Sequence, residues 1–322
     1  MNKSEIYYKN GFSWPLLFST IPIIIISIPG ILTNIVLICV TIKNKALHGT
    51  TNFLLAQLAF YEIIHETSYF VVLYCNLIGL NSLTYSKASR LFSVPLFTVF
   101  GISPLMAFTG IDRLLYVIFP ISFPKKVNPT IYLGVYTFIC VIYCGLMTAG
   151  LIWFNNVNPD LVVSALLSDV LTGYVGTTLY YNISFILNNT TIALYIAVGI
   201  IVKMRKTSIQ QKNRRLIRAL IIIVIFNVGG FYIVRIFKYF ILSYKLSEMN
   251  SLFIRKAVCT LLYVSITANA PVLYFISKEY KASFRRFFGL STNQTSPIII
   301  INKLPLKNNF VSNNQELTLK YN

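Results

Sequence analysis

The sequence predicts an all-α membrane protein, built as a bundle of seven membrane-spanning helices. Three observations support this fold class. Of the 322 residues, 56% are hydrophobic and only 11% are charged, whereas a soluble domain carries about 25% charged residues. Seven apolar runs are long enough to cross the hydrocarbon core of a bilayer as helices. The Lys and Arg residues gather in segments that alternate along the chain, as membrane topology requires.

The seven apolar runs define the expected spans, because a helix needs about 20 consecutive apolar residues to cross a bilayer. The runs are residues 16–42, 52–77, 91–118, 130–154, 181–202, 216–242 and 256–277. A further apolar stretch at 161–176 is short for a span and contains Asp169. We expect this stretch to form a long outer loop that packs on the bundle.

The basic residues predict how the bundle is oriented. They concentrate after the first, third, fifth and seventh runs, most densely in residues 203–218 and beyond residue 277. Such an excess marks the cytosolic side of a membrane. Because the number of spans is odd, the N-terminus is expected outside the cell. The chain then divides into an extracellular N-terminus at 1–15, a transmembrane domain at 16–288 and a disordered cytosolic tail at 289–322, rich in Asn, Ser and Thr.

The composition argues against several other classes of protein. A net charge of +19 could indicate nucleic-acid binding, but the basic clusters are short collars between apolar runs. The two histidines, His48 and His65, and the five cysteines lack the spacing of a metal site. The sequence contains no nucleotide-binding or hydrolase loop. We therefore expect no catalytic residues, no metal, no cofactor and no nucleic-acid partner.

Five short motifs occur in order along the runs, at the positions expected of helix ends and helix centres. They are Gly30-x-x-x-Asn34 in the first run, Leu58-Ala-x-x-Glu62 in the second, Asp112-Arg113-Leu114 with Pro120 at the end of the third, Asn269-Ala-Pro271-x-x-Tyr274 in the seventh, and Ser277-Lys-Glu-Tyr-Lys-x-x-Phe284 beyond it. The set resembles rhodopsin-like G-protein-coupled receptors. Asp-Arg-Leu, the last motif and a short third inner loop are similar to nematode chemoreceptors of the serpentine receptor class sx, over about residues 20–288.

This resemblance implies a receptor, not an enzyme, that binds a small extracellular ligand and activates a heterotrimeric G protein. It implies coupling and activation roles for five residues, namely Asp112, Arg113, Pro120, Tyr195 and Tyr274. Arg113 would pair with Asp112 at rest and reach the G protein when the sixth helix moves, after which the two tyrosines would restrain it. The alternative for Asp112 and Arg113 is an interface anchor pair. The segment after the seventh run would be an amphipathic helix on the membrane surface.

A buried polar cluster is expected between the first, second and seventh helices. Its members would be Asn34, Glu62, Asn269 and Pro271. Such a cluster allows helices to rearrange without leaving polar groups unpaired in lipid. A protonated structural carboxyl group is the alternative for Glu62. His65 and Glu66 lie one turn away, and we expect them to have structural roles.

A ligand pocket is expected in the outer half of the bundle, between the third, fifth and sixth helices. Its candidate residues are Phe92, Pro95, Leu96, Val99, Phe185 and Arg235. Pro95 occupies the position at which amine receptors of the resembled superfamily hold their ligand-binding Asp. The expected ligand is therefore largely apolar or weakly anionic. Arg235 and Lys238 either extend to the outer headgroups or attract an anionic ligand.

Two departures from the resembled superfamily have structural consequences. Ala88 occupies the position of the usual outer disulfide cysteine, and residues 155–180 contain no cysteine, so the outer loop is expected to be looser. The sixth run lacks the usual Cys-Trp-x-Pro motif. Phe226 aligns with its aromatic switch and Gly230 then replaces its Trp. The activation relay in that helix is therefore expected to differ.

Two other functions stay open. A neuropeptide or internal-metabolite receptor would share the architecture and differ in its ligand. A transporter or channel is favoured less, because the sequence shows no internal repeat and Pro95 and Pro104 lie in one expected helix. For the leading hypothesis, the expected location is the plasma membrane, as a multi-pass protein, with sensory cilia as a candidate compartment. Its partners would be the lipid bilayer, a small molecule and a heterotrimeric G protein.

Overall fold

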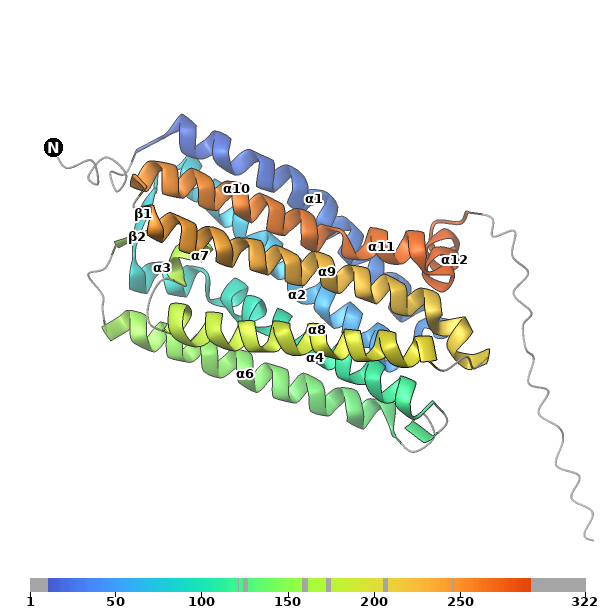
Figure 1. The fold of residues 1–322 in the computed structure, drawn as a ribbon. Helices are drawn as coiled ribbons and strands as arrows, with labels where there is room; N and C mark the ends of the chain where they lie inside the picture. The colour runs from blue at the N-terminus through green and yellow to red at the C-terminus, as the bar shows by residue number, and fades with distance from the viewer. Residues whose placement is uncertain are drawn as a thin grey trace, which may run out of the picture.

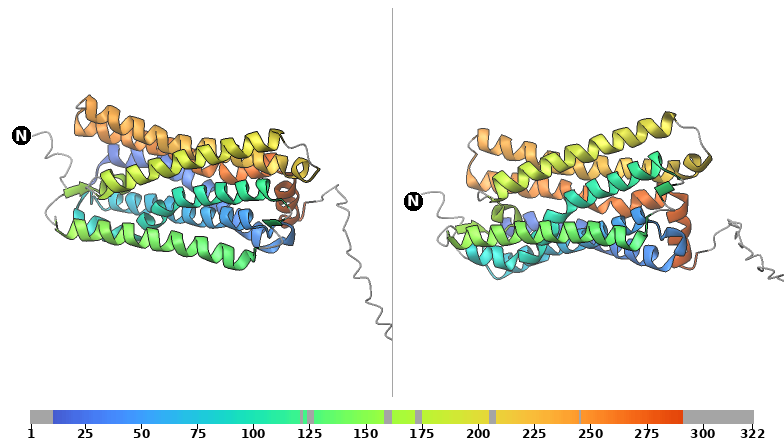
Figure 2. Two further views of the ribbon diagram at one scale, coloured as in Figure 1. Left: turned by 60° about the horizontal axis from the view of Figure 1, so that its bottom comes forward. Right: turned by 90° about the horizontal axis from the view of Figure 1, so that it is seen from below.

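The computed structural model describes residues 11–120, 122–123, 127–157, 162–171, 175–204, 208–244 and 246–290. These residues form a nearly all-helical bundle, whose long helices lie side by side in every view (Figures 1 and 2). The helices are α1 (Trp14–Lys43), α2 (Thr50–Leu77), α3 (Tyr85–Leu91), α4 (Ser93–Ile118), α6 (Pro129–Val157), α7 (Leu167–Val170), α8 (Tyr181–Met204), α9 (Ser208–Ser243), α10 (Glu248–Thr267), α11 (Asn269–Ile276) and α12 (Lys278–Phe287). The short helical turns η1 (Lys45–Leu47) and η2 (Val175–Tyr180) and the strands β1 (Ser82–Thr84) and β2 (Val162–Ser164) complete the described elements.

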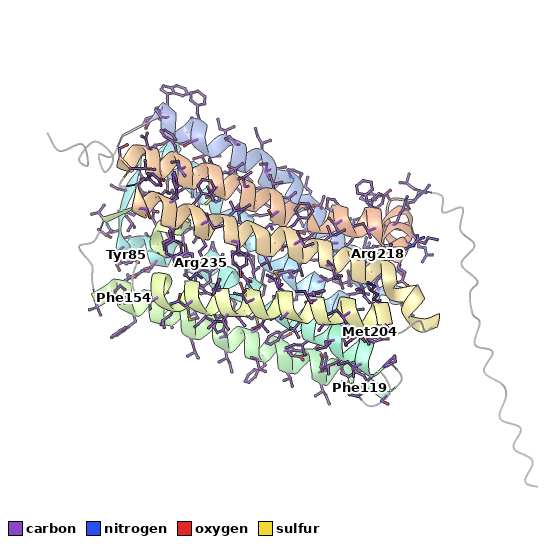
Figure 3. The ribbon with its side chains drawn as sticks, viewed as in Figure 1. Tyr85, Phe119, Phe154, Met204, Arg218 and Arg235 are labelled. Atoms are coloured by element: carbon purple, nitrogen blue, oxygen red, sulfur yellow. The ribbon has the colours of Figure 1, made fainter. Side chains whose placement is uncertain are left out.

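Two short features distinguish the ends of the bundle. β1 and β2 pair antiparallel, with Leu83 opposite Val163, and we call the end at which they lie the hairpin end. α12 lies at the opposite end, which we call the α12 end (Figure 1). In Figure 3, Tyr85 and Phe154 mark the hairpin end, and Met204 and Arg218 lie toward the α12 end.

Six helical segments are long and apolar enough to cross a membrane. They are Trp14–Lys43, Ser93–Ile118, Pro129–Val157, Thr178–Met204, Arg215–Ile241 and Asn250–Ile276. Each corresponds to one of the runs expected from the sequence. The remaining run corresponds to α2, which has 28 residues and packs within the bundle. α2 is less apolar because its buried face carries Glu62, His65 and Glu66.

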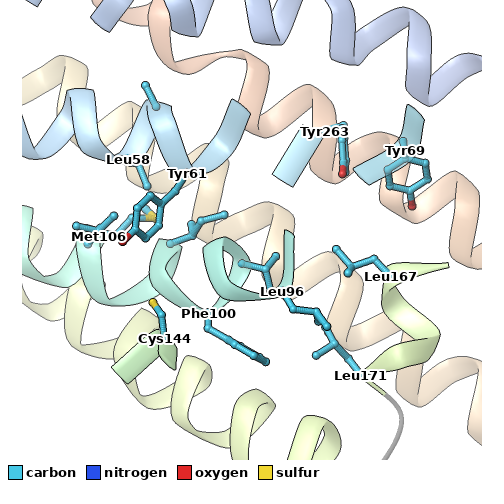
Figure 4. Close-up of a cluster of buried hydrophobic side chains, with 14 of the residues drawn as sticks. Leu58, Tyr61, Tyr69, Leu96, Phe100, Met106, Cys144, Leu167, Leu171 and Tyr263 are labelled. Atoms are coloured by element: carbon cyan, nitrogen blue, oxygen red, sulfur yellow. The ribbon is translucent and has the colours of Figure 1, made fainter. Parts of the chain in front are cut away.

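α4 forms the centre of the bundle. In its most apolar window, 78% of the residues are buried, against 22–39% for the other five segments. Figure 4 shows Tyr61 of α2, Leu96 and Met106 of α4 and Leu167 of α7 in one contiguous apolar cluster. The outward faces of the surrounding helices expose large apolar side chains, such as Leu146 of α6, as expected of helices that face lipid.

The seventh apolar run is divided into α10 and α11 by its proline. Pro271 has no N–H and cannot make the hydrogen bond to the carbonyl of Thr267 that an uninterrupted helix would contain. The helix therefore breaks at Ala268, and α11 begins at Asn269. The sequence indicated one continuous span here, beginning at residue 256, whereas α10 begins earlier, at Glu248.

α12 begins where the sequence placed an amphipathic helix. The Ser277 hydroxyl caps it by accepting a hydrogen bond from the Tyr280 N–H. Tyr280 and Phe284 are buried on one face, whereas Lys278 and Lys281 are exposed on the other. Burial raises the pKa of the Tyr280 phenol, which therefore stays protonated and donates to Oδ1 of Asn52 at 3.1 Å. α12 is thus attached to the start of α2.

Of the stretch 161–176, expected to be an outer loop, the structure describes residues 162–171 and 175–176. Residues 162–171 pack on the bundle as a strand and a helical turn. All five cysteines of the chain are free, so noncovalent contacts hold this segment in place. Its strand pairs with β1, and Val170 O accepts a hydrogen bond of 2.9 Å from the Tyr85 hydroxyl. An ion pair joins Asp169 to Arg255 of α10, with Nε and Oδ1 3.4 Å apart.

Candidate functional site

Asp112 and Arg113 lie in the last turns of α4, at the α12 end, and both are buried. Asp112 Oδ1 accepts a 2.7 Å hydrogen bond from the Thr50 hydroxyl, and Oδ2 accepts one from Thr51. Both donors belong to the first turn of α2, where the helix dipole also favours a carboxylate. Asp112 therefore joins α4 to α2.

Arg113 is held less tightly than its neighbour. Its Nε lies 3.8 Å from Asp112 Oδ2 and has no hydrogen-bond partner among the described residues. Its guanidinium carbon lies 5.7 Å from the centre of the Tyr116 ring. The Asp112 carboxylate is thus engaged mainly by α2, and the guanidinium of Arg113 keeps donors that no described group uses.

The structure places the other expected coupling residues in different surroundings. Tyr195 is buried on α8 and faces α4 at Gly110, where an added Cβ would come within 3.3 Å of its ring. Pro120 lies in the turn that follows α4. The Tyr274 ring packs against Phe284 of α12, with centroids 5.8 Å apart. Tyr195 is therefore close to the Arg113 segment, whereas the ring contacts of Tyr274 are with Phe275 of its own helix and Phe284 of α12.

A small apolar cluster lies toward the α12 end, one turn beyond Arg113. Val117 of α4, Val198 of α8 and Ile217 of α9 are buried against one another. Three helices therefore meet there through aliphatic side chains.

The expected polar cluster is present and extends further than the sequence indicated. Glu62 is fully buried and accepts hydrogen bonds from Asn269 Nδ2 at 2.6 Å and from Asn34 Nδ2 at 3.3 Å. Asn269 Oδ1 in turn accepts from Asn227 Nδ2 of α9 at 2.6 Å. The cluster therefore joins α1, α2, α9 and α11. Pro271 lies two residues after Asn269, at the helix break that positions this amide.

Glu66 lies one turn beyond Glu62 and explains the glycine of the first motif. It is fully buried, and its Oε1 accepts a 3.4 Å hydrogen bond from the Thr267 hydroxyl. A Cβ at Gly30 would lie 2.3 Å from Glu66 Oε1 and 2.6 Å from Thr267 Oγ1. A larger residue at position 30 would force the Glu66 carboxyl group and the Thr267 hydroxyl to move.

A buried lysine joins α10 to α1 near the hairpin end. Lys256 is 3% exposed. Its Nζ donates to the Leu16 carbonyl at 2.9 Å and to the hydroxyls of Ser19 and Thr20 at 2.8 Å each. Asn76 of α2 also donates to Thr20 Oγ1, at 2.8 Å. An ammonium group has three N–H donors, so the hydrogen-bonding capacity of Lys256 is fully used.

A cavity of about 140 Å³ opens between α9 and α10, beneath α7. Lys238 of α9, Arg255 of α10 and Asp169 of α7 supply its charged groups. Lys238 Nζ lies 3.9 Å from the centre of the Tyr181 ring. The rest of the wall is largely apolar, formed by Val234, Phe237, Ile241 and Val258 together with Cys259.

A smaller cavity of about 30 Å³ lies beside the first and shares Tyr181 with it. Phe185 and Arg235, two of the expected pocket residues, line it. Arg235 Nη1 donates to the Tyr181 carbonyl at 2.8 Å, and its guanidinium carbon lies 4.3 Å from the Phe185 ring centre. The other expected pocket residues are Phe92, which directly precedes α4, and Pro95, Leu96 and Val99 of α4, and all four are buried.

Comparison with known families assigns this architecture. The family model described as serpentine type 7TM GPCR chemoreceptor Srsx matches residues 27–288. The chain belongs to the Srsx family. The matched region runs from the middle of α1 to the end of α12 and includes the Asp112–Arg113 segment, the polar cluster and both cavities. No curated protein matches the chain. This Srsx chain is therefore a multi-pass membrane protein of a receptor family.

Several residues of the Srsx chain were not expected at these sites from the sequence, and only the structure places them there. Asn227 has no periodic signal, because it is one polar residue within a long apolar run. The sequence indicates Asp169 as an acid in an apolar stretch, but it gives no sign of a pairing with Arg255, which lies 86 residues later in the chain.

Proposed function

We propose that this Srsx chain is a chemosensory G-protein-coupled receptor, which binds a small extracellular ligand at the hairpin end and activates a heterotrimeric G protein at the α12 end. The position of Arg113 carries the proposal. Arg113 is a buried cation whose Nε has no hydrogen-bond partner among the described residues, and Val117 of the apolar cluster lies one turn further along α4. Displacement of α9 would expose this cation to an acceptor group on a cytosolic partner.

We further propose that α2 also spans the membrane, which brings the number of spans to seven. The hairpin end would then face the outside of the cell. The described parts of the most basic segments, residues 203–204, 208–218 and 278–290, lie at the α12 end (Figure 1), as expected for the cytosolic side. α12 would lie on the membrane surface, with Lys278 and Lys281 at anionic headgroups. Segment 1–15 would then be extracellular, 16–288 the receptor domain and 289–322 a cytosolic tail; of these, residues 1–10 and 291–322 lie outside the described residues.

α9 is the element best placed to connect the two ends. It is a single helix of 36 residues. It carries Lys238 in the cavity, Asn227 in the polar cluster and Ile217 in the apolar cluster at the α12 end. At 1.5 Å per residue, Lys238 and Ile217 are about 30 Å apart along the helix axis. A ligand that tilts α9 at the cavity would strain the Asn227–Asn269 hydrogen bond and open the apolar cluster.

The size of the cavity supports a small molecule over a peptide. A space of about 140 Å³ approaches that of an engineered cavity, about 150 Å³, that accommodates benzene. An environmental compound and an internal metabolite fit such a space equally well. The proposed location is the plasma membrane, with sensory cilia as the compartment that would favour an environmental compound.

The proposal is tested by the exchange activity of Arg113 variants. Ile217→Ala, which weakens the apolar cluster, should raise basal GTPγS binding by a panel of purified heterotrimeric G proteins in receptor-containing membranes. Adding Arg113→Ala should remove most of this increase, roughly 10-fold or more, because one charge-assisted contact contributes about 1.5–3 kcal/mol.

Arg90→Ala is the matched control, because Arg90 is an exposed arginine at the hairpin end. It should leave the exchange activity of the Ile217→Ala receptor unchanged at equal surface expression. If the Ile217→Ala, Arg113→Ala receptor exchanges nucleotide as fast as Ile217→Ala alone, Arg113 does not couple to the G protein.

A further inference from the structure

We propose that the cavity between α9 and α10 binds a small organic monoanion, with a carboxylate head on Lys238 and a short apolar body against α9 and α10. This inference deepens the proposed function and rests on it for the ligand's signalling role. The binding step itself requires only the cavity and its charges.

The charged groups described on the cavity wall are two cations and one carboxylate. Asp169 pairs with Arg255, with Nε–Oδ1 at 3.4 Å and Nη2–Oδ2 at 3.5 Å. Among the described residues, no carboxylate lies within ion-pair distance of Lys238, whose nearest recorded partner is the Tyr181 ring at 3.9 Å. Lys238 is half-buried, so an anion bound beside its partly desolvated ammonium group would interact with it favourably. The site therefore favours one added negative charge.

The geometry indicates where the anion would bind. Lys238 and Arg255 line the same cavity from two different helices. A carboxylate between them would accept a hydrogen bond from the ammonium group and could reach the Arg255 Nε, which has an ion-pair contact with Asp169 but no hydrogen bond. The cavity wall carries two cations, Lys238 and Arg255, and one anion, Asp169. A bound carboxylate would make the number of negative charges equal to the number of positive charges. A dianion would exceed this balance.

The apolar wall limits the rest of the ligand. Val234, Phe237 and Ile241 of α9 face the cavity together with Val258 of α10. A body of roughly six heavy atoms matches a cavity of this size. The ligand class is therefore a short-chain or aromatic carboxylic acid in its ionised form. A primary amine would meet two cations and should be rejected.

Arg235 does not offer an equivalent site. Its Nη1 is already bound to the Tyr181 carbonyl at 2.8 Å, and its guanidinium lies over the Phe185 ring. The cavity that it lines is only about 30 Å³, close to the volume of one water molecule in the liquid. Arg235 therefore fits a role in fixing α9 against α8, and Lys238 is the residue that remains for the ligand.

The test is direct binding to the full-length receptor in nanodiscs, without a G protein. Isothermal titration with hexanoate and benzoate should give binding, whereas hexanamide, benzamide and hexylamine should not bind. Lys238→Gln should weaken the Kd of the carboxylates by about tenfold or more, because a charge-assisted hydrogen bond is lost. Lys238→Arg should retain binding within about threefold, which also shows that position 238 tolerates replacement.

Lys87→Gln is the matched control, because Lys87 is an exposed lysine at the same end of the bundle. It should bind the carboxylates like the wild type. Equal affinity for amides and carboxylates, no binding of either carboxylate, or full affinity in Lys238→Gln would each overturn the proposal. Carboxylate binding without any G-protein activation would leave this inference standing and reject the proposed function instead.

Discussion

Two lysines near the hairpin end occupy opposite kinds of surroundings. Lys256, in the seam between α1 and α10, donates to three oxygen atoms and is 3% exposed. Lys238, in the cavity between α9 and α10, rests on an aromatic ring. Both are cations near the hairpin end, yet among the described contacts only Lys256 has all three of its donors satisfied. The difference suggests that a saturated buried charge stabilises the fold, whereas an unsaturated one is available to a ligand.

The largest expected effect is a difference in stability between two matched variants. Lys256→Met removes three charge-assisted hydrogen bonds that join α10 to α1, and should lower the free energy of unfolding by about 2 kcal/mol. Lys238→Met removes a cation without a counter-ion, and should leave stability within about 0.5 kcal/mol of the wild type. Thermal unfolding of the purified, ligand-free receptor measures both. If both variants lost the same stability, the three hydrogen bonds of Lys256 would not stabilise the fold more than the contacts of Lys238 do.

A smaller effect is expected from one acceptor of Lys256. Thr20→Val keeps the shape of the side chain but removes the oxygen that accepts from Lys256 and from Asn76. We expect a loss of about 1 kcal/mol in the same unfolding measurement. Thr33→Val is the control, because the Thr33 hydroxyl bonds only to carbonyls of its own helix. If Thr33→Val lost as much stability as Thr20→Val, the hydrogen bonds of Thr20 to Lys256 and Asn76 would not explain the loss.

The smallest effect is expected from the ion pair at the cavity. Arg255 is about one-third exposed, with 34% of its side chain accessible, and pairs of this kind contribute about 0.2–1 kcal/mol. A double-mutant cycle with Asp169→Asn and Arg255→Gln should therefore give a coupling energy near 0.5 kcal/mol. A coupling above about 2 kcal/mol would show that the pair is part of the structural framework and not an adjustable wall of the ligand site.

The sequence predicted the spans well because hydropathy is a local property. Six of the seven expected runs match helices that are long and apolar enough to span a membrane. The remaining run, residues 52–77, corresponds to α2. Helix ends beyond the hydrocarbon core were less predictable. α9 begins at Ser208 instead of residue 216, and α10 at Glu248 instead of residue 256, because polar residues that continue a helix outside the apolar core give no hydropathy signal.

The polar cluster was predictable from motif positions, whereas the cavity was not. Asn34, Glu62 and Asn269 each stand in a recognisable motif, and the structure brings them together as expected. Asp169 and Arg255 are 86 residues apart, and nothing in a single sequence pairs them. The pocket residues Phe92, Pro95, Leu96 and Val99 were expected from the resemblance to the receptor superfamily, and the structure shows these side chains buried at the centre of the bundle. Their burial depends on the neighbouring helices, which the local sequence does not specify.

The hairpin end is assembled without a sulfur–sulfur bond. β1 and β2, the Tyr85–Val170 hydrogen bond and the Asp169–Arg255 ion pair hold the segment over the cavity, and all five thiols are free. Newly made chains therefore require no oxidative step to complete this end, and reducing agents cannot unfasten it. Each of these contacts also breaks and reforms far faster than a disulfide exchanges, so a rearrangement at this end of the bundle would not have to wait for thiol chemistry.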